Sequence, residues 1–534
     1  MNLRPALHQH LRQRLQAFSE GFRQNLALIG PPGSGKTFQL QQLAASAPER
    51  LLVISCPLYR ESCRSFLQRF LGAILEAGLT SASGISGPAA QPATLSLEQW
   101  LGRAEAVFPR TVAAMRPIEG LLTRRLYGEA FNRTLETIPR LIEERGRPCV
   151  LILDEFLYLE ELGFHHAFHE LGKRVMTWPS TLFVLSSSSA YRAKLILRER
   201  LQLLFGQFEL LTLETLDPAI ADAWANQELA QIAGASEAIP FLIHWLGSYP
   251  WYLAVLLKRL KELAALQHRA TLSEALFLQA AWDVLGSREG MLHQWCLSCT
   301  ETLSTNRLGA RALEALLQMA KGAKTPTAIG QAIGRAGLSD ALQVLLEHDL
   351  AQRKGMCWII TNPALRCWLS TILTLQRTEA RWDDAAARRQ FDGELRGMWQ
   401  TWSHRQRQPL AEQVARLFTQ FADETISLDA KTGRLPKFDS VQTASADPDR
   451  QSAYLIASGD GKRWCATVHD GPVDEQAISR FEMFCRSQSP KPSRKIIITT
   501  APMDAHATLL AKAAKMWIWE PDDLNILRGI YGQP

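Results

Sequence analysis

The sequence predicts an α/β fold: a parallel sheet with helices on both faces carries a phosphate-binding loop, and helical and mixed α/β modules follow it. A glycine-rich loop joins a strand-like segment to a helix-like segment near the start of the chain. Apolar runs typical of buried strands then alternate with helical stretches up to about residue 215. Such alternation indicates a parallel sheet, because parallel strands need crossover connections.

The composition indicates a multidomain chain without a membrane span. The 534 residues, 46% of them apolar, are too many for one compact core. Lys and Arg outnumber Asp and Glu by 59 to 53, an excess that permits contact with nucleic acid but does not require it. The longest apolar segment, 241–257, is interrupted by His244, Gly247, Ser248 and Pro250. Without a secretion signal or a disulfide pattern, we expect a cytoplasmic location.

The loop near the start of the chain has the spacing of a phosphate-binding motif. Gly30, Gly35, Lys36 and Thr37 satisfy G-x-x-x-x-G-K-[ST] between the strand "NLALI" and the helix "KTFQLQQLAA". Glycines leave backbone N–H groups accessible to phosphate oxygens, and the helix directs its positive end at the same anion. Lys36 is expected to reach the terminal phosphates and Thr37 to hold Mg²⁺. The residues expected to bind the nucleotide here are Gly30, Pro31, Pro32, Gly33, Ser34, Gly35, Lys36, Thr37 and Phe38.

An acidic pair follows the second clear strand. Val150 to Leu153 form an uninterrupted apolar run, as a strand buried on both faces requires. Asp154 comes next and is expected to ligate Mg²⁺ together with Thr37, whereas Glu155 is placed to activate the attacking water. An ordinary surface Asp-Glu turn is the alternative.

Three further strands are predicted at 51–55, 181–186 and 208–213, which makes five in one sheet. The strand 181–186 runs into four consecutive serines. Ser186 or Ser187 is expected to touch the terminal phosphate or the attacking water, unless the serines merely begin a loop. We take Lys36, Glu155 and Ser186 as the catalytic set.

Beyond the loop, "LILDEF", "FVLSSSS", "LLFGQFELLTLETL" and "GSYPWYL" follow one another in the order seen in archaeal-type ATPases. The chain therefore resembles that family, which belongs to the STAND branch of the AAA+ superfamily. The resemblance implies ATP and Mg²⁺ as ligands and a helical lid after the sheet. The stretch Gly247 to Pro250 resembles the family's glycine-x-proline signature, which implies that Pro250 helps couple bound nucleotide to the lid. A helix-breaking turn is the alternative.

One departure from the family concerns an arginine. Gln207, after Phe205 and Gly206, stands where the family usually carries an arginine, and a Gln cannot supply that charge. Candidate substitutes on the preceding segment are Arg192, Arg198 and Arg200. Hydrolysis is therefore expected to be slow or to depend on a partner.

The resemblance implies four domains. They are an ATPase core at 1–215, a helical lid at 216–304, a winged helix at 305–378 and a restriction-endonuclease-like domain at 386–534. Three helices, 308–320, 325–335 and 338–349, and a hairpin around Gly355 make up the winged-helix pattern.

The third of these helices is poorly suited to reading DNA. It carries Asp340, Glu347 and His348 on its polar side, and the acids would repel phosphates. Arg353 and Lys354 of the hairpin suit only a backbone contact. This pattern favours a module that packs against protein or grips DNA without sequence specificity.

The last domain lacks part of a nuclease site. Glu412 and Asp439 stand at the first two acidic positions of such nucleases. Within "CATVHD", Ala466 or Thr467 occupies the third acidic position, and Val468 or His469 occupies that of the lysine. We expect an inactive nuclease relic; a His469–Asp470 pair is a remaining alternative.

These patterns predict an ATP-binding and ATP-hydrolysing molecular switch. Its C-terminal modules would engage DNA, mostly through the backbone, or a DNA-associated partner in mobile-element, defence or repair biology. The alternative is a regulatory or scaffold STAND ATPase that binds a protein partner and has no nucleic-acid role. An active nuclease and a small-molecule kinase are less favoured, and the sequence leaves homo-oligomer formation open.

Overall fold

The computed structural model describes residues 3–83, 96–164, 166–199, 207–378, 383–428, 431–447 and 452–531. The chain divides into two compact units. The first comprises Met1–Glu228, Ser248–Ala254 and Glu347–Asp349, and the second Leu229–Gly247, Val255–Leu346 and Leu350–Pro534. Arg200, Phe205 and Gly206 lie outside the described residues.

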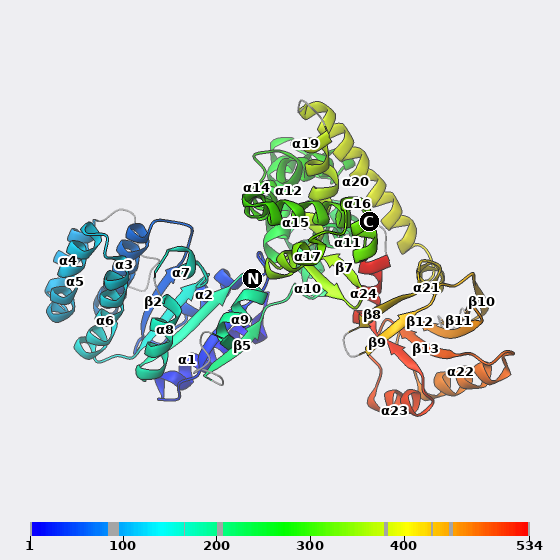
Figure 1. Cartoon of the computed structure of the whole chain (residues 1–534), viewed down its shortest axis with the longest axis horizontal. Coiled ribbons are helices and arrows are strands. Elements are labelled where there is room, and N and C mark those ends of the chain that lie inside the picture. The colour runs from blue at the N-terminus through cyan, green and yellow to red at the C-terminus, as the bar shows by residue number, and fades with distance from the viewer. Residues whose placement is uncertain are drawn as a thin grey trace. The chain divides into compact units, whose positions relative to one another are not determined.

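The first unit is built on a five-stranded parallel sheet, which confirms the predicted fold class (Figure 1). The strand order is β2-β3-β4-β1-β5, so the loop-bearing strand β1 lies between β4 and β5. Every residue of β1, β3 and β4 is buried, as their apolar runs require. The strands are β1 (Asn25–Ile29), β2 (Leu52–Pro57), β3 (Cys149–Asp154), β4 (Thr181–Ser187) and β5 (Phe208–Thr212).

Helices cover both faces of this sheet. α1 (Pro5–Ser19) and α2 (Lys36–Ala45) pack on one face. α3 (Cys63–Ser83), α6 (Tyr127–Arg145) and α8 (Ala167–Thr177) pack on the other. The carboxyl ends of β1, β3 and β4 therefore open at one edge between the two helical layers, where ligands bind in such sheets.

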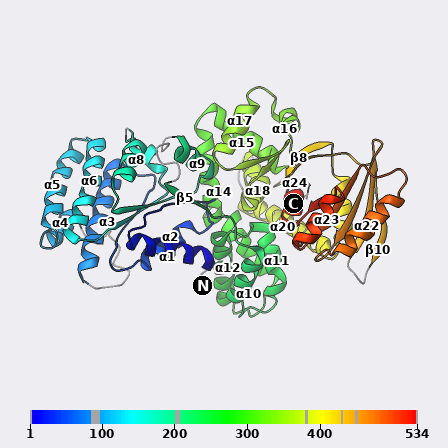
Figure 2. The ribbon, with the colours of Figure 1, turned by 90° about the horizontal axis from the view of Figure 1, so that it is seen from below.

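A helical insertion separates β2 from β3. Figures 1 and 2 both show α3, α4 (Leu97–Glu105), α5 (Pro109–Thr123) and α6 gathered at one end of the first unit. Phe66 and Phe131 of this insertion pack with Phe164, which follows β3, and the rings of Phe131 and Phe164 stack with centroids 4.7 Å apart. The sequence predicted helical stretches between the strands but not this packed cluster.

Helices α10 (Pro218–Glu228), α11 (Ala235–Leu246), α12 (Pro250–Leu266), α13 (Glu274–Ala281) and α14 (Met291–Glu301) occupy the segment predicted to be helical after the sheet. Among the helices that the structure describes, none is both long and apolar enough to cross a membrane.

Three helices and a hairpin follow in the second unit. They are α15 (Arg307–Ala320), α16 (Pro326–Ile333), α17 (Leu338–Glu347) and the antiparallel pair β6 (Ala351–Lys354) and β7 (Cys357–Ile360). The order of these elements agrees with the prediction.

The predicted end of the third helix was wrong by two residues. α17 ends at Glu347, and Asp349 has a φ of 55°, which a right-handed helix cannot contain. Asp349 therefore lies in a loop.

The C-terminal part of the second unit contains a mixed sheet of order β10-β11-β12-β13-β14. The first three strands are antiparallel, and the last two run parallel to β12. α21 and α24 cover one face and α22 and α23 the other, as Figure 1 shows. The elements are β10 (Ser440–Asp447), β11 (Ser452–Gly459), β12 (Lys462–His469), β13 (Arg494–Thr499), β14 (Trp517–Trp519), α21 (Leu410–Thr419), α22 (Glu475–Ser487), α23 (Ala505–Ala513) and α24 (Pro521–Tyr531).

Several elements of this part were not predicted. α18 (Pro363–Trp368) and α19 (Thr374–Thr378) precede the long helix α20 (Asp384–Gln406), which begins where the sequence placed a domain boundary. A hairpin of β8 (Glu424–Leu428) and β9 (Lys431–Leu435) lies between α21 and β10.

The residues at the predicted nuclease positions differ in exposure and in secondary structure. Glu412 is exposed in the first turn of α21, and Asp439 is exposed one residue before β10 rather than on a strand. Thr467 is buried in β12, where its Oγ1 lies 2.8 Å from His469 Nε2. Asp470 accepts a hydrogen bond from Thr500 Oγ1, and among the described residues no hydrogen bond joins His469 to Asp470.

Candidate active site

The glycines of the loop after β1 are required by its geometry. A Cβ on Gly30 would lie 2.2 Å from the carbonyl oxygen of Leu213, closer than any side chain can approach. Gly33 and Gly35 have φ values of 79° and 94°, in the left-handed region that favours glycine. Gly35 is also the N-cap of α2, so no side chain caps the first N–H groups of that helix. The loop thus presents backbone donors at a helix N-terminus.

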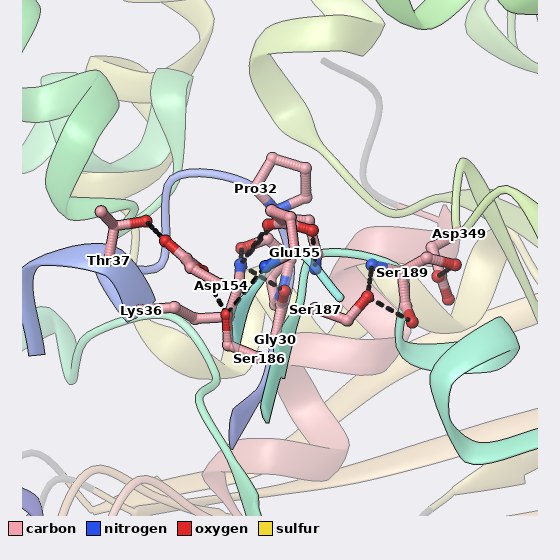
Figure 3. A network of polar contacts seen from close by, with 12 residues as sticks. Gly30, Pro32, Lys36, Thr37, Asp154, Glu155, Ser186, Ser187, Ser189 and Asp349 are labelled. Carbon is pink, nitrogen blue, oxygen red and sulfur yellow. Dashed lines mark hydrogen bonds and ion pairs between the residues drawn. The ribbon is translucent and has the colours of Figure 1, made fainter. Parts of the chain in front are cut away.

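Lys36 is the first residue of α2, and its ammonium group bonds back to the loop (Figure 3). Its Nζ donates to Gly30 O at 2.9 Å, to Pro31 O at 3.2 Å and to Ser188 Oγ at 2.8 Å, and lies 3.9 Å from Glu155 Oε1. The side chain is only 4% exposed. Burial lowers the pKa of Lys36, while the nearby carboxylates of Glu155 and Asp154 act in the opposite direction. The ammonium group therefore acts in an environment where water screens it weakly.

Thr37 and Asp154 meet at the end of β3. Thr37 Oγ1 donates to Asp154 Oδ2 at 2.7 Å, and Ser186 Oγ donates to Asp154 Oδ1. Asp154 is 6% exposed. Two hydrogen-bonded oxygen ligands at one point are the kind of donor set that Mg²⁺ prefers.

Glu155 has an unusual backbone conformation, with a φ of 56°. Its carboxylate accepts hydrogen bonds from the Ser188 N–H at 2.8 Å and from Ser188 Oγ, and its own N–H donates to Ser186 Oγ at 3.3 Å. A left-handed conformation in a residue other than glycine costs free energy and concentrates at functional sites. Here it accompanies a carboxylate placed beside Lys36.

The serines after β4 have different environments. Ser186, the predicted catalytic serine, is fully buried and holds Asp154. Ser187 is also buried and accepts from the Ser189 N–H at 3.1 Å. Ser188 is the serine that contacts both Lys36 and Glu155. Sequence reasoning missed Ser188, because a run of four serines does not reveal which hydroxyl faces the loop.

The start of α12 contacts the glycine-rich loop. Pro250 begins this helix, the Trp251 N–H donates to Gly33 O at 3.2 Å, and Tyr252 Oη donates to Pro32 O at 3.3 Å. A Cβ on Gly33 would lie 3.0 Å from Tyr252 Cε1. Pro250 was predicted from the sequence, whereas Trp251 and Tyr252 were not.

Phe38, also predicted to bind nucleotide, lies in the first turn of α2. Its side chain is 45% exposed. It is therefore accessible, and its hydrocarbon ring can offer a nucleotide an apolar contact but no hydrogen bond.

Asp349 reaches the loop that carries Ser188. Its Oδ2 accepts from Ser189 Oγ at 3.0 Å and from the Tyr191 N–H at 3.2 Å, at the start of α9 (Ala190–Glu199). Burial raises the pKa of Asp349, and these hydrogen bonds counteract the shift. A residue that follows α17 in the chain thus holds the segment next to the site.

Arg192 and Arg198, two candidate substitutes for the family arginine, both lie on α9. Arg192 Nη2 forms an ion pair with Glu160 Oε2 at 3.0 Å, and Arg198 lies in the last turn of α9. The Oε1 atom of Gln207 is buried without a hydrogen-bond partner among the described residues. Arg192 is therefore already engaged within its own unit.

The site has features that fit a phosphate chain and a divalent cation. Ser34 is fully buried, and its Oγ has no hydrogen-bond partner among the residues that the structure describes. This orphaned hydroxyl, the uncapped N-terminus of α2 and the Lys36 ammonium group are all donors suited to phosphate oxygens. Thr37 and Asp154 supply the oxygens suited to Mg²⁺.

Comparison with known proteins agrees with this geometry. Residues 4–185 match the family model of the AAA ATPase domain. The match includes the glycine-rich loop, Asp154, Glu155 and most of β4. This part of the chain is therefore similar to AAA ATPase domains, whereas the narrower archaeal-type and STAND assignments remain predictions. No curated protein matches the chain.

Solved structures with a similar arrangement include the Walker-type ATPase PABY2304 of Pyrococcus abyssi. It has 15% identity and a TM-score of 0.46, covering 68% of this chain and 95% of that one. The ORC2 protein of Aeropyrum pernix, described as ADPNP-ADP complexes, has 15% identity and a TM-score of 0.40, with coverages of 71% and 96%. The Aeropyrum pernix ORC1 protein in complex with DNA has 14% identity and a TM-score of 0.37, with coverages of 70% and 94%. Because all three TM-scores are below 0.5, these likenesses carry no conclusion about function.

Proposed function

We propose that this chain is an ATP-binding and ATP-hydrolysing molecular switch. The observation that carries the proposal is the single network that joins Lys36, Ser188 and Glu155 beside the Thr37–Asp154 pair. Lys36 would contact the terminal phosphates, and Glu155 would accept a proton from the attacking water. Thr37 and Asp154 would hold Mg²⁺, which when bound offsets negative charge on the phosphates.

The same network supports slow basal hydrolysis. Lys36 Nζ lies 3.9 Å from Glu155 Oε1, and Ser188 bonds to both side chains. These contacts engage both groups with each other, so that their rearrangement on ATP binding would limit the rate. Because Gln207 replaces the family arginine, a partner is a reasonable source of the missing positive charge.

Two contacts support coupling of nucleotide state to the rest of the chain. Trp251 and Tyr252 connect the glycine-rich loop to α12, and Asp349 connects the Ser188 segment to the residues that follow α17. A displacement of Ser188 would move the adjacent Ser189, whose hydroxyl donates to Asp349, and would thereby displace Asp349.

We expect Asp349→Ala to uncouple α17 from the nucleotide site without abolishing ATP binding. In the unaltered protein, ATP with Mg²⁺ should change hydrogen–deuterium exchange across residues 338–354. In the variant this change should disappear, while ATP affinity stays within about threefold, because Asp349 is separated from the glycine-rich loop by Ser189. Exchange mass spectrometry and calorimetry measure the two effects.

The matched control is Asp340→Ala, which removes an exposed carboxylate on α17 itself. It should leave the ATP-dependent change in exchange intact. If Asp349→Ala retained that change in full, the proposed connection through Asp349 would be wrong.

Packing constrains the β6–β7 hairpin, which the sequence predicted to be the wing of a winged helix. The Met356 N–H donates to Thr425 O at 2.8 Å, and a Cβ on Gly355 would lie 2.4 Å from the same oxygen. The backbone of the hairpin tip thus packs against β8, and Arg353 Nε donates back to Gly355 O at 2.8 Å. This packing disfavours a groove-reading wing.

We therefore propose that the C-terminal modules contact the DNA backbone without reading sequence, or contact a DNA-associated protein. The packing of this hairpin favours, as a second candidate, a scaffold ATPase that binds a protein partner only. We propose no nuclease activity, because Ala466 and Thr467 supply no carboxylate on β12.

Duplex DNA should raise the ATPase rate of the purified chain, and its binding should weaken at least about tenfold between about 50 and 200 mM salt. This follows if lysines and arginines contact the DNA backbone and release counterions. ATP hydrolysis and fluorescence anisotropy with labelled duplex measure the two effects. Undetectable DNA binding at the lower salt concentration would reject the DNA-binding proposal in favour of the protein-partner function.

A further inference from the structure

A basic cavity of about 510 Å³ lies within the second unit, between α11, α18, α20, α21 and α24. Four arginines and one histidine line it: Arg366, Arg405, Arg416, Arg528 and His244. None of the described residues that line the cavity is acidic. Its volume is within the range of pockets that hold small molecules.

Two of the arginines that line this cavity, Arg366 and Arg528, lack an acidic partner among the residues that the structure describes. Arg366 forms no ion pair with any residue that the structure describes, and Arg528 Nη2 donates to the neutral Gln413 Oε1 at 3.1 Å. Burial lowers the pKa of both arginines. The pKa of His244 is lowered by burial and then by the charges of Arg405, Arg366 and Arg528. Like charges around one cavity raise the free energy of the fold, and a bound anion would lower it.

Aromatic rings form another part of the lining. Trp402 is half-buried and lines the cavity, whereas Phe241, Trp245 and Tyr531 also line it but are covered by other side chains, so Trp402 is the ring with surface left for a ligand. Tyr531 Oη donates to Glu424 Oε2 at 2.7 Å, so that its polar group is already satisfied. Guanidinium forks suit phosphate oxygens, and aromatic faces suit the rings of nucleobases.

We propose that this cavity binds the phosphate group of a nucleotide, with the base against Trp402. The nucleotide is either free or the 5′-terminal residue of a strand, since both present the same phosphate and ring. The site lies in a different unit from the glycine-rich loop. It does not rest on the proposed ATPase function.

The test uses the full chain with Lys36→Ala, so that the glycine-rich loop contributes little to binding. Calorimetry with adenosine monophosphate, a 5′-phosphorylated trinucleotide and its unphosphorylated counterpart should show binding only of phosphorylated probes, without a need for Mg²⁺. Adding Arg366→Gln should weaken that binding at least tenfold, as expected when a charged hydrogen-bond donor to phosphate is lost. Binding of the monophosphate alone identifies a free nucleotide, and preference for the trinucleotide identifies a strand end.

Arg407→Gln is the matched control, because Arg407 is exposed in the same region but does not line the cavity. It should leave affinity unchanged. Arg366→Lys should restore part of it, and Arg528→Gln provides a second test should Arg366→Gln impair folding, which circular dichroism would show. Failure of all phosphorylated probes to bind, or equal affinity in the folded Arg366→Gln and Arg528→Gln proteins, would overturn the proposal.

Discussion

Glu155→Gln is expected to slow ATP hydrolysis by about 10²- to 10⁴-fold while ATP still binds, the range that general-base catalysis supplies. The amide has nearly the same shape as the carboxylate and can still accept the hydrogen bond from the Ser188 N–H. It cannot accept a proton from water. Steady-state hydrolysis and equilibrium binding of ATP, measured on the same preparation, separate the two effects.

The control for this prediction is Glu161→Gln, an exposed residue of α7 (Tyr158–Glu161) that pairs with Arg60. It should hydrolyse ATP at the unaltered rate. Full activity in Glu155→Gln would mean that another group activates the water, and the left-handed backbone at Glu155 would need a different explanation.

Lys36→Ala is expected to weaken Mg²⁺-dependent ATP binding at least about 100-fold, or about 2.7 kcal/mol, as the loss of a buried charge contact requires. The fold should survive, because burial disfavours the charged form of Lys36 and its removal therefore costs the folded state little. The conformation of the loop depends instead on Gly30, Gly33 and Gly35. Titration with ATP and Mg²⁺, together with circular dichroism, measures both outcomes.

Lys173→Ala serves as the comparison for Lys36→Ala. Lys173 is exposed on α8 and pairs with Glu170. Its loss should change neither affinity nor fold, since exposed ion pairs contribute little. If Lys36→Ala bound ATP and Mg²⁺ as tightly as the unaltered protein, the ammonium group would have no role in phosphate binding.

Local sequence was sufficient to predict the sheet and the loop. The strand-loop-helix pattern around Gly30 and the apolar run before Asp154 both depend on residues adjacent in the chain. Since parallel strands end at a common edge, placing Thr37 near Asp154 required no knowledge of side-chain packing.

The residues that sequence reasoning missed depend on contacts between distant segments. Ser188 differs from its three serine neighbours only in the direction of its side chain after β4. Tyr252 and Asp349 lie far along the chain and meet the loop region only through tertiary packing. Periodicity and motif spacing carry no information about such contacts.

The C-terminal part was predicted in outline only. α20 was missed although Ala387, Phe391 and Leu395 recur at helical spacing on its buried side. The basic cavity could not be predicted, because its lining residues come from helices far apart in the sequence, α11, α18, α20, α21 and α24. No local motif marks these residues.

Calorimetric titration of the intact chain with ATP and Mg²⁺ tests the central claim most directly. We predict heat from one Mg²⁺-dependent ATP site per chain that is lost in Thr37→Ala and Lys36→Ala. No detectable heat, or Mg²⁺-dependent binding that both variants retain, would contradict the assignment of the glycine-rich loop as the nucleotide site.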